Sequence, residues 1–262
     1  MLAAVLAGSS SLATPALPSE QAPASEFFDE DYQPVAPAVA MYEQRAPLRH
    51  DAARQAWHWQ LHFAQPPGKL HMDAWLRDAD TTRPDYVHQR SVYFADGQLG
   101  LLEERNGEGD FDGVNVAYYA DGTVKSRKAY RGGEYEGMHS HYHPNGQLSH
   151  ALRYEAGQPA DGEYLSFDAH GQVSNRAHFV DGVLTGKVEA FHPDGRLAER
   201  GAYLDGQRDG LYEAWWPDGR EKSRLHYVQG RKHGLERNWT EDGTRTVCAW
   251  QDGSLLRPCS NF

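Results

Sequence analysis

Cysteine is scarce in this sequence, and its scarcity excludes two kinds of small fold. The 262 residues contain only two cysteines, Cys248 and Cys259. A disulfide scaffold uses several cysteine pairs, and a four-cysteine zinc site needs twice as many thiolates as the chain supplies. The composition therefore excludes both and leaves a single disulfide to be considered.

Long apolar runs and excess positive charge are also missing. A membrane-spanning helix needs roughly 18 or more consecutive apolar residues, and no such run is present, so no membrane span is predicted. Lysine and arginine total 26 against 37 aspartates and glutamates, which gives a formal net charge of −11. A surface of this sign repels phosphate backbones and anionic lipids, so nucleic acid is not expected as a partner.

The first forty residues differ in composition from the rest. Residues 1–13 hold a short apolar run followed by small residues, which is typical of the second half of an export signal, although the usual basic start is missing. The alternative is an unstructured tail rich in alanine and serine. Residues 14–40, with five prolines and several acids, are predicted to form an extended tether. The run before position 9 resembles that of bacterial lipoproteins, but a lipid anchor would require cysteine where Ser9 stands.

Glycine recurs with a regular period from residue 96 onward. One series of turn pairs is spaced by 24 or 25 residues: Asp96-Gly97, Asp121-Gly122, Asn145-Gly146, His170-Gly171, Asp194-Gly195, Asp218-Gly219 and Asp242-Gly243. A second series falls between them: Gly113, Gly137, Gly162, Gly186, Gly210 and Gly234. Asp-Gly and Asn-Gly tolerate the positive φ of a tight hairpin turn, so each unit is predicted to be a β-hairpin with two turns.

Aromatic residues follow the same period. The fifth residue after each second-series glycine is always aromatic: Tyr118, Tyr142, Phe167, Phe191, Trp215 and Trp239. The eighth residue after the turn glycine is aromatic in five successive units: Tyr130, Tyr154, Phe179, Tyr203 and Tyr227. We expect both columns to share one packed face, because strand positions of equal parity do. The predicted fold is all-β: an elongated antiparallel meander of about six 24-residue hairpins with a small N-terminal cap.

The residues one place beyond the first aromatic column are predicted to point the other way. They include Tyr119, His143, His192 and Trp216. An exposed tryptophan flanked by histidine and tyrosine has the composition of an interface anchor, so we predict that these four residues bind a partner. The alternative is that the sheet curls or the cap covers them.

Catalytic and metal-binding patterns give no strong signal. The chain has no Gly-x-Ser-x-Gly elbow and no Walker loop, so no enzyme activity and no cofactor are predicted. His139, His141 and His143 alternate along one strand and would lie about 7 Å apart on one face. That spacing suits a metal poorly, so a surface or partner-contacting role is favoured over a metal site.

The repeats carry a resemblance to a known family. Units such as YLDGQRDGLYEAWWPDGR (203–220) and FVDGVLTGKVEAFHPDGR (179–196) resemble MORN-type repeats, in particular their bacterial antitoxin-like variant. The resemblance covers about residues 91–257, within a predicted repeat domain of 91–262 that ends in a capping hairpin. Residues 41–90 keep only a degenerate repeat and are expected to form the cap, with a short helix in its first part.

The resemblance implies a binding or scaffolding module, since the bacterial variants are associated with antitoxins and immunity proteins. Combined with the export signal, it favours a periplasmic immunity protein that neutralises a cognate secreted toxin, including one of phospholipase type. The alternative is a cell-envelope scaffold or adhesion module that binds several proteins.

The two cysteines also bear on the compartment. Cys248 and Cys259 are symmetric about the step between Gly253 and Ser254, so a hairpin there would place them opposite each other, within disulfide range. We therefore predict a disulfide that staples the last hairpin, which requires an oxidising compartment. The alternative is two reduced thiols near a frayed end.

Overall fold

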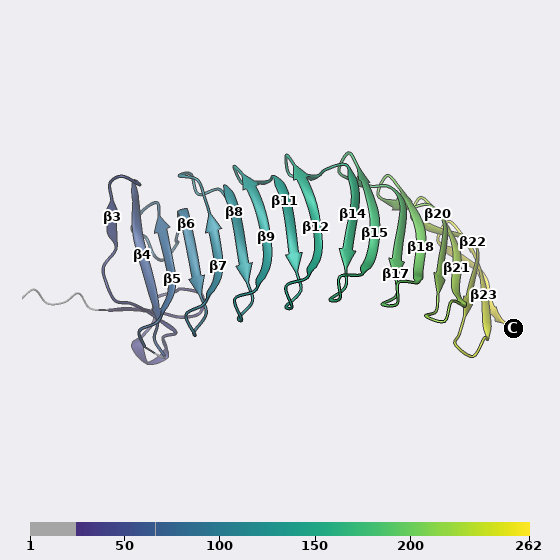
Figure 1. Cartoon of the computed structure of the whole chain (residues 1–262), viewed down its shortest axis with the longest axis horizontal. Coiled ribbons are helices and arrows are strands. Elements are labelled where there is room, and N and C mark those ends of the chain that lie inside the picture. Colours follow the sequence, from purple (N-terminus) through teal and green to yellow (C-terminus); the bar gives the residue numbers. More distant parts are fainter. Residues whose placement is uncertain (1–24, 66) are drawn as a thin grey trace, which may run out of the picture.

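A computed structural model describes residues 25–65 and 67–262 and shows one long antiparallel sheet of 24 strands. From β4 onward, successive hairpins lie side by side in chain order along the long axis of the molecule (Figure 1). The described residues contain one short 3-10 helix and no helix that is long and apolar enough to cross a bilayer. The predicted all-β meander is thus confirmed.

The strands before the regular repeats vary in length from three to eight residues. They are β1 Glu26–Phe28, β2 Tyr42–Gln44, β3 Arg49–Asp51, β4 Ala56–Phe63, β5 Leu70–Leu76, β6 Tyr86–Tyr93 and β7 Leu99–Glu104, with the 3-10 helix η1 at Pro37–Val39.

The regular repeats alternate a six-residue and an eight-residue strand. These are β8 Gly113–Tyr118, β9 Val124–Arg131, β11 Gly137–Tyr142, β12 Leu148–Glu155, β14 Gly162–Phe167, β15 Val173–Val180, β17 Gly186–Phe191, β18 Leu197–Leu204, β20 Gly210–Trp215 and β21 Glu221–Val228. Two-residue strands precede four of them: β10 Glu134–Tyr135, β13 Gln158–Pro159, β16 Val183–Leu184 and β19 Gln207–Arg208. The last strands are β22 Arg231–Trp239, β23 Arg245–Gln251 and β24 Ser254–Asn261.

The predicted Asp-Gly and Asn-Gly turns form one long edge of the sheet, the lower edge in Figure 1. In a representative turn, the backbone N–H of Gly195 donates to the carbonyl of His192, and Gly195 has a φ of 80°. The Asp194 carboxylate accepts the N–H of Arg196 at 3.0 Å. Glycine closes the loop because it adopts positive φ without steric cost, and the aspartate satisfies a backbone donor.

The turns at the opposite edge lie four or five residues earlier than the second glycine series predicts. Asp205 and Gly206 both have positive φ, 50° and 74°, which is the pattern of a two-residue type I′ turn. Gly210 instead marks the point where the strand resumes after β19. The error has a local cause: the equivalent turns at Ala156-Gly157 and Gln229-Gly230 lack the aspartate that makes such pairs recognisable.

Hydrogen bonds join each turn at this edge to its neighbour. The Asp209 carboxylate accepts the N–H of Gln229 at 3.0 Å, and Asp161 accepts the N–H of Asp181 at 2.7 Å. Both pairs are separated by 20 residues, so each bond spans two successive repeats. The acid before a second-series glycine therefore fixes the next turn.

The two aromatic columns lie on opposite faces of the sheet, so the prediction that they share one face is wrong. Gly210 pairs with Tyr227, and Trp215 lies an odd number of residues beyond Gly210, so strand alternation separates the two rings. We call the face with Tyr203, Tyr212 and Tyr227 the tyrosine face. We call the other the arginine face, because Arg176, Arg200 and Arg224 lie on it opposite Leu165, Glu189 and Glu213.

The most buried apolar cluster lies at the N-terminal end of the sheet. Phe28, Trp59, Leu61, Met72 and Leu76 are each almost fully buried there. The Phe28 and Trp59 rings meet edge to face at a centroid distance of 5.7 Å. Each buried large apolar side chain contributes about 1.5 to 3 kcal/mol, so this cluster anchors the array.

Two predictions for the N-terminal region need correction. Part of the predicted tether, residues 14–40, is folded: Glu26–Phe28 pairs with β2, because Phe28 has an apolar pocket to fill. The expected short helix after residue 41 is absent, and β2 and β3 pair with β4 instead. The predicted export signal, residues 1–13, and the first part of the tether lie outside the described residues.

The predicted disulfide between Cys248 and Cys259 is present, with a Cα–Cα distance of 4.3 Å. The hairpin is less symmetric than expected, because Gln251 pairs with Ser254 whereas Val247 pairs with Ser260. Two register shifts beside Ala249 accommodate the difference and bring the cysteines opposite each other.

We predict that Gly201→Ala destabilises the fold by about 1 to 3 kcal/mol through overpacking. A Cβ at position 201 would lie 2.3 Å from the Tyr212 ring, which rests on the glycine backbone. Urea unfolding of Gly201→Ala, Tyr212→Val and the double variant checks this. In the double variant the added Cβ should cost little, and strictly additive losses would contradict the prediction.

We predict that reducing the disulfide lowers the free energy of unfolding by about 2 to 3 kcal/mol, because the unfolded chain gains conformational entropy when the loop is opened. The short loop keeps this loss moderate. Urea unfolding with and without reductant measures the loss, and a double Cys248→Ser, Cys259→Ser variant is the control. That variant should be insensitive to reductant. Equal midpoints for oxidised and reduced wild-type protein would contradict the prediction.

Candidate functional site

Three of the four predicted partner-binding residues hold successive repeats together. Tyr119 donates from its hydroxyl to the carbonyl of Tyr142 at 2.8 Å. His143 and His192 donate from Nε2 to the carbonyls of Phe167 and Trp215, at 2.9 and 3.0 Å. Each bond links the first residue of one Asp-Gly or Asn-Gly loop to the repeat that follows. The structure thus gives these side chains a structural role.

The fourth residue, Trp216, is half-buried, so the prediction that it is exposed is wrong. The Lys222 ammonium lies 4.6 Å from its ring centroid and covers part of the ring. Its indole nitrogen Nε1 is buried and has no hydrogen-bond partner among the described residues. Trp216 therefore occupies the loop position of His192 without making the bond that His192 makes.

The histidines of the MHSHYH segment have separate environments. His139 is buried among tyrosines and bonds through Nε2 to the carbonyl of Ala129 at 2.7 Å. His141 stacks on His150, directly opposite on β12, with ring centroids 4.5 Å apart and an interplanar angle of 15°. Within residues 25–65 and 67–262 no group of three or more candidate ligands is placed to hold a metal ion.

The surroundings of His141 and His150 lower the pKa of both side chains and so favour their neutral forms. Burial lowers the pKa of His141, and the neighbouring His150 and Lys128 lower it further. Burial also lowers the pKa of His150, with a smaller effect from His143. A protonated pair would place two like charges face to face in the middle of the array.

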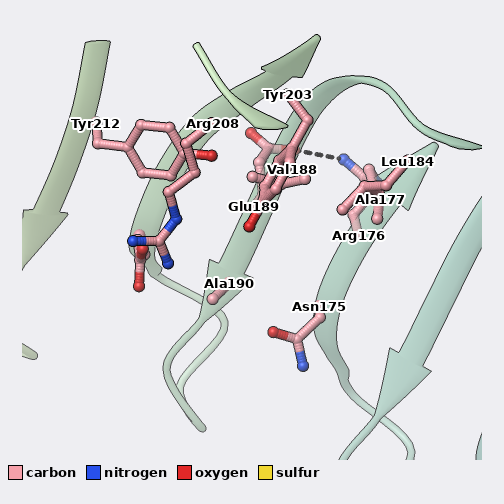
Figure 2. A pocket seen from close by; sticks show the side chains of 11 residues that line it. Asn175, Arg176, Ala177, Leu184, Val188, Glu189, Ala190, Tyr203, Arg208 and Tyr212 are labelled. Carbon is pink, nitrogen blue, oxygen red and sulfur yellow. Dashed lines mark hydrogen bonds and ion pairs between the residues drawn. The ribbon is translucent and has the colours of Figure 1, made fainter. Parts of the chain in front are cut away.

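A groove of two adjoining hollows crosses the strands of the tyrosine face and is the strongest candidate site; Figure 2 shows the first hollow. Its first hollow, 220 Å³, has Ala177, Val188 and Ala190 on its lining, with Tyr203 and Tyr212 on one side. A second hollow of 290 Å³ adjoins it, since Glu199, Arg208 and Tyr212 line both. The groove therefore runs over several successive strands, from β15 to β22.

Arg208 is the cation that lines both hollows of the groove. Its guanidinium carbon lies 5.1 Å from the ring centroid of Tyr212 and 5.4 Å from that of Tyr227, in cation–π range. Its Nη1 donates to the Tyr227 hydroxyl at 3.3 Å. Hydrogen bonding to Tyr203 and Tyr227 raises the pKa of Arg208, so it stays charged. No carboxylate of the described residues lies within ion-pair distance of it.

The opposite face is occupied by internal ion pairs. Glu213 is buried and accepts hydrogen bonds from Arg200 and, at 2.8 Å, from Arg224. These bonds, from Arg200 first, lower the pKa of the Glu213 carboxyl. Arg200 also lies over the Trp215 ring at 5.4 Å. The charges of the arginine face are therefore largely paired within the sheet.

The sequence prediction missed the groove because it chose residues one place beyond the first aromatic column, whereas Tyr203 and Tyr227 of the second column line the groove. A third column, two residues after the second-series glycines, holds His139, Tyr164 and Tyr212; Asn115 and Glu236 stand at its two ends, and Val188 interrupts it between Tyr164 and Tyr212. That interruption is visible in the sequence and coincides with the first hollow. The predicted site residues lie instead at the Asp-Gly edge.

No family model matches the sequence, and no curated protein matches it. Among solved structures, the GtfA/B complex bound to UDP and GlcNAc aligns over 44% of this chain and 22% of its own, at 14% identity and a TM-score of 0.20. TcdB2-TccC3 aligns over 84% and 15%, at 11% identity and a TM-score of 0.22. The Photorhabdus luminescens Tc holotoxin pore aligns over 90% and 14%, at 12% identity and a TM-score of 0.21. Such low TM-scores support neither a shared fold nor a shared function, and the chain spans less than a quarter of these proteins.

We predict that the protein loses stability as the pH falls from 7 to 5. Since the folded pKa values of His141 and His150 lie below the ordinary 6.5, the unfolded chain takes up protons first. Their stabilising effect is complete above pH 6.5 and is lost as the pH falls toward the folded values. Urea midpoints measured across this range check the prediction.

The His141→Gln variant should show a shallower pH dependence than the wild type, because it removes the like-charge contact. The matched control is His226→Gln, which changes an exposed histidine of β21. A slope that falls equally in both variants would assign the effect to general charge and not to the stacked pair.

Proposed function

We propose that this protein is an exported immunity protein that binds and neutralises a cognate secreted bacterial toxin through its repeat sheet. The observation that carries the proposal is the open groove of the tyrosine face, where rings and a charged guanidinium line a surface that crosses several strands. Tyrosine and arginine are the residues that dominate binding energy at protein interfaces. The resemblance of the repeats to antitoxin-like MORN variants supports a toxin as the partner, including one of phospholipase type.

The disulfide supports a periplasmic location for this activity. Cys248 is buried, and its bond to Cys259 holds β24 against β23. Such bonds persist in oxidising compartments and are rare in the cytosol. An immunity protein against a toxin that acts in the envelope has to be present there.

A cell-envelope scaffold that binds several proteins is the second candidate. It is favoured by the single-layer construction of the repeats, in which both columns of rings stay half-buried and neither face is covered by another layer. A repeat array of this kind offers separate surfaces to separate partners. Stoichiometry distinguishes the two candidates.

We predict that affinity capture from the native envelope, followed by mass spectrometry, yields one dominant partner in a one-to-one complex. The partner should be a toxin whose activity falls when the purified protein is added. Several partners held at once, without any loss of toxin activity, would favour the scaffold. Capture of cytosolic proteins alone would contradict both the immunity protein and the scaffold.

We further predict that Trp216→Ala weakens this complex by about 2 kcal/mol, close to thirtyfold in Kd, if the partner reaches the Asp-Gly edge. Trp216 is the one of the four predicted residues whose side chain makes no hydrogen bond to the following repeat, so its truncation removes no such bond. The control is His226→Ala, an exposed position of β21. Circular dichroism should remain unchanged in both variants, and equal affinities would remove the edge from the interface.

A further inference from the structure

One repeat lacks a ring that its neighbours have. The position two residues after the second-series glycine carries Tyr164 in one repeat and Tyr212 two repeats later, with Val188 between them. The ring centroids of Tyr164 and Phe179 lie 6.4 Å apart, and those of Tyr203 and Tyr212 lie 6.3 Å apart. Val188 leaves the line of rings interrupted between these two pairs.

The interruption has room for a ring. The hollow at Val188 measures 220 Å³, and a protein cavity of about 150 Å³ is known to accept benzene. Ala177 and Ala190 line it beside Val188, Leu184 lies on it from β16, and Tyr203 and Tyr212 border it (Figure 2). The sheet thus presents a depression, open to solvent, that combines these aromatic and aliphatic side chains with the polar residues Asn175, Arg176, Glu189, Glu199 and Arg208.

The rim of the hollow carries a cation. Arg208 is exposed, makes no ion pair within the described residues, and is held over the Tyr212 and Tyr227 rings. Glu199 lines the same hollow, but no ion pair joins its carboxylate to Arg208. Arg176 also lines the hollow, but it is paired with Glu163 and Glu189, so Arg208 is the lining arginine whose guanidinium has no acidic partner. A carboxylate can pair with it in bidentate geometry.

We propose that the hollow at Val188 receives an aromatic side chain of the partner protein, with a neighbouring carboxylate of that partner paired to Arg208. The inserted ring takes the place that Tyr164 and Tyr212 fill in their own repeats. This inference rests on the proposed function, because it specifies how the partner is held. Polysaccharide suits the site less well, since Tyr212 is only 6% exposed and Arg208 covers it, so the face of this ring is not free for a sugar to stack on.

We call the hollow at Val188 the slot, and small probes test it without knowledge of the partner. We expect 4-hydroxyphenylacetate to bind the full chain with a Kd on the order of millimolar and to shift the backbone NMR signals of Ala177, Val188 and Ala190. Tyramine, which carries an ammonium in place of the carboxylate, should bind at least tenfold more weakly. Acetate should not shift these signals. Preferential binding of maltotriose there would overturn the proposal in favour of a glycan site.

Variants at the slot give matched comparisons. Val188→Tyr supplies the missing ring from within the chain and should abolish binding of 4-hydroxyphenylacetate while keeping or raising the urea midpoint. Ala177→Leu fills the same hollow from β15 and serves if Val188→Tyr folds poorly. Val183→Tyr, at an exposed valine outside the hollow, should leave binding unchanged. Unchanged binding in both filled variants would overturn the proposal.

Variants of Arg208 and Glu199, the two charged lining residues that make no ion pair within the described residues, separate recognition of the ring from recognition of the carboxylate. Arg208→Gln should weaken 4-hydroxyphenylacetate about tenfold and leave tyramine no weaker. Glu199→Gln, on the same rim, should not weaken 4-hydroxyphenylacetate. Equal losses from both substitutions would contradict the assigned role of Arg208.

The captured partner closes the test and separates the two proposals. A partner that binds wild type but loses at least tenfold in affinity for Val188→Tyr supports both. A partner that binds wild type and Val188→Tyr equally is consistent with the proposed function but overturns the proposal that the slot receives an aromatic side chain. Probe binding that is lost in Val188→Tyr, without any captured toxin, supports the slot as a binding site and overturns the toxin assignment.

Discussion

The structure depends on hydrogen bonding between neighbouring hairpins, because a single-layer sheet has no second layer against which to bury its faces. In the repeats, rings pack on rings across adjacent strands, and Glu213 is buried only between Arg200 and Arg224. The two long edges are tied from one repeat to the next, by acids such as Asp209 on one side and by His192 on the other. Each contact reaches one neighbour, so the array is stable only as a continuous stack.

This constraint explains which parts of the fold the sequence predicts. Positive φ at Gly195 and its equivalents admits few other residues, so the Asp-Gly and Asn-Gly series locates one edge of the sheet directly. The opposite edge was misplaced, because a two-residue turn such as Gln229-Gly230 has no distinctive composition. The all-β class and the disulfide follow from local spacing, whereas the packing of Phe28 against Trp59 joins distant segments and leaves no periodic signal.

The candidate site was predictable only in part, and for a related reason. The four residues chosen from the sequence do lie in register, but hydrogen bonds to the following repeat occupy Tyr119, His143 and His192. The groove arises where the repeat pattern is broken, at Val188. A search for regularly spaced residues does not select such a position. In a repeat protein the regular positions maintain the fold, so functional surfaces are better sought at the exceptions.

The uneven distribution of the core has a consequence for the order of folding. The largest buried cluster lies in the strands before β7, and almost every later contact joins strands close in sequence. A chain that emerges N-terminus first during synthesis would complete its densest packing while the later hairpins were still being made. Each new hairpin would then meet an existing strand edge, and the open strand edges would be covered one at a time.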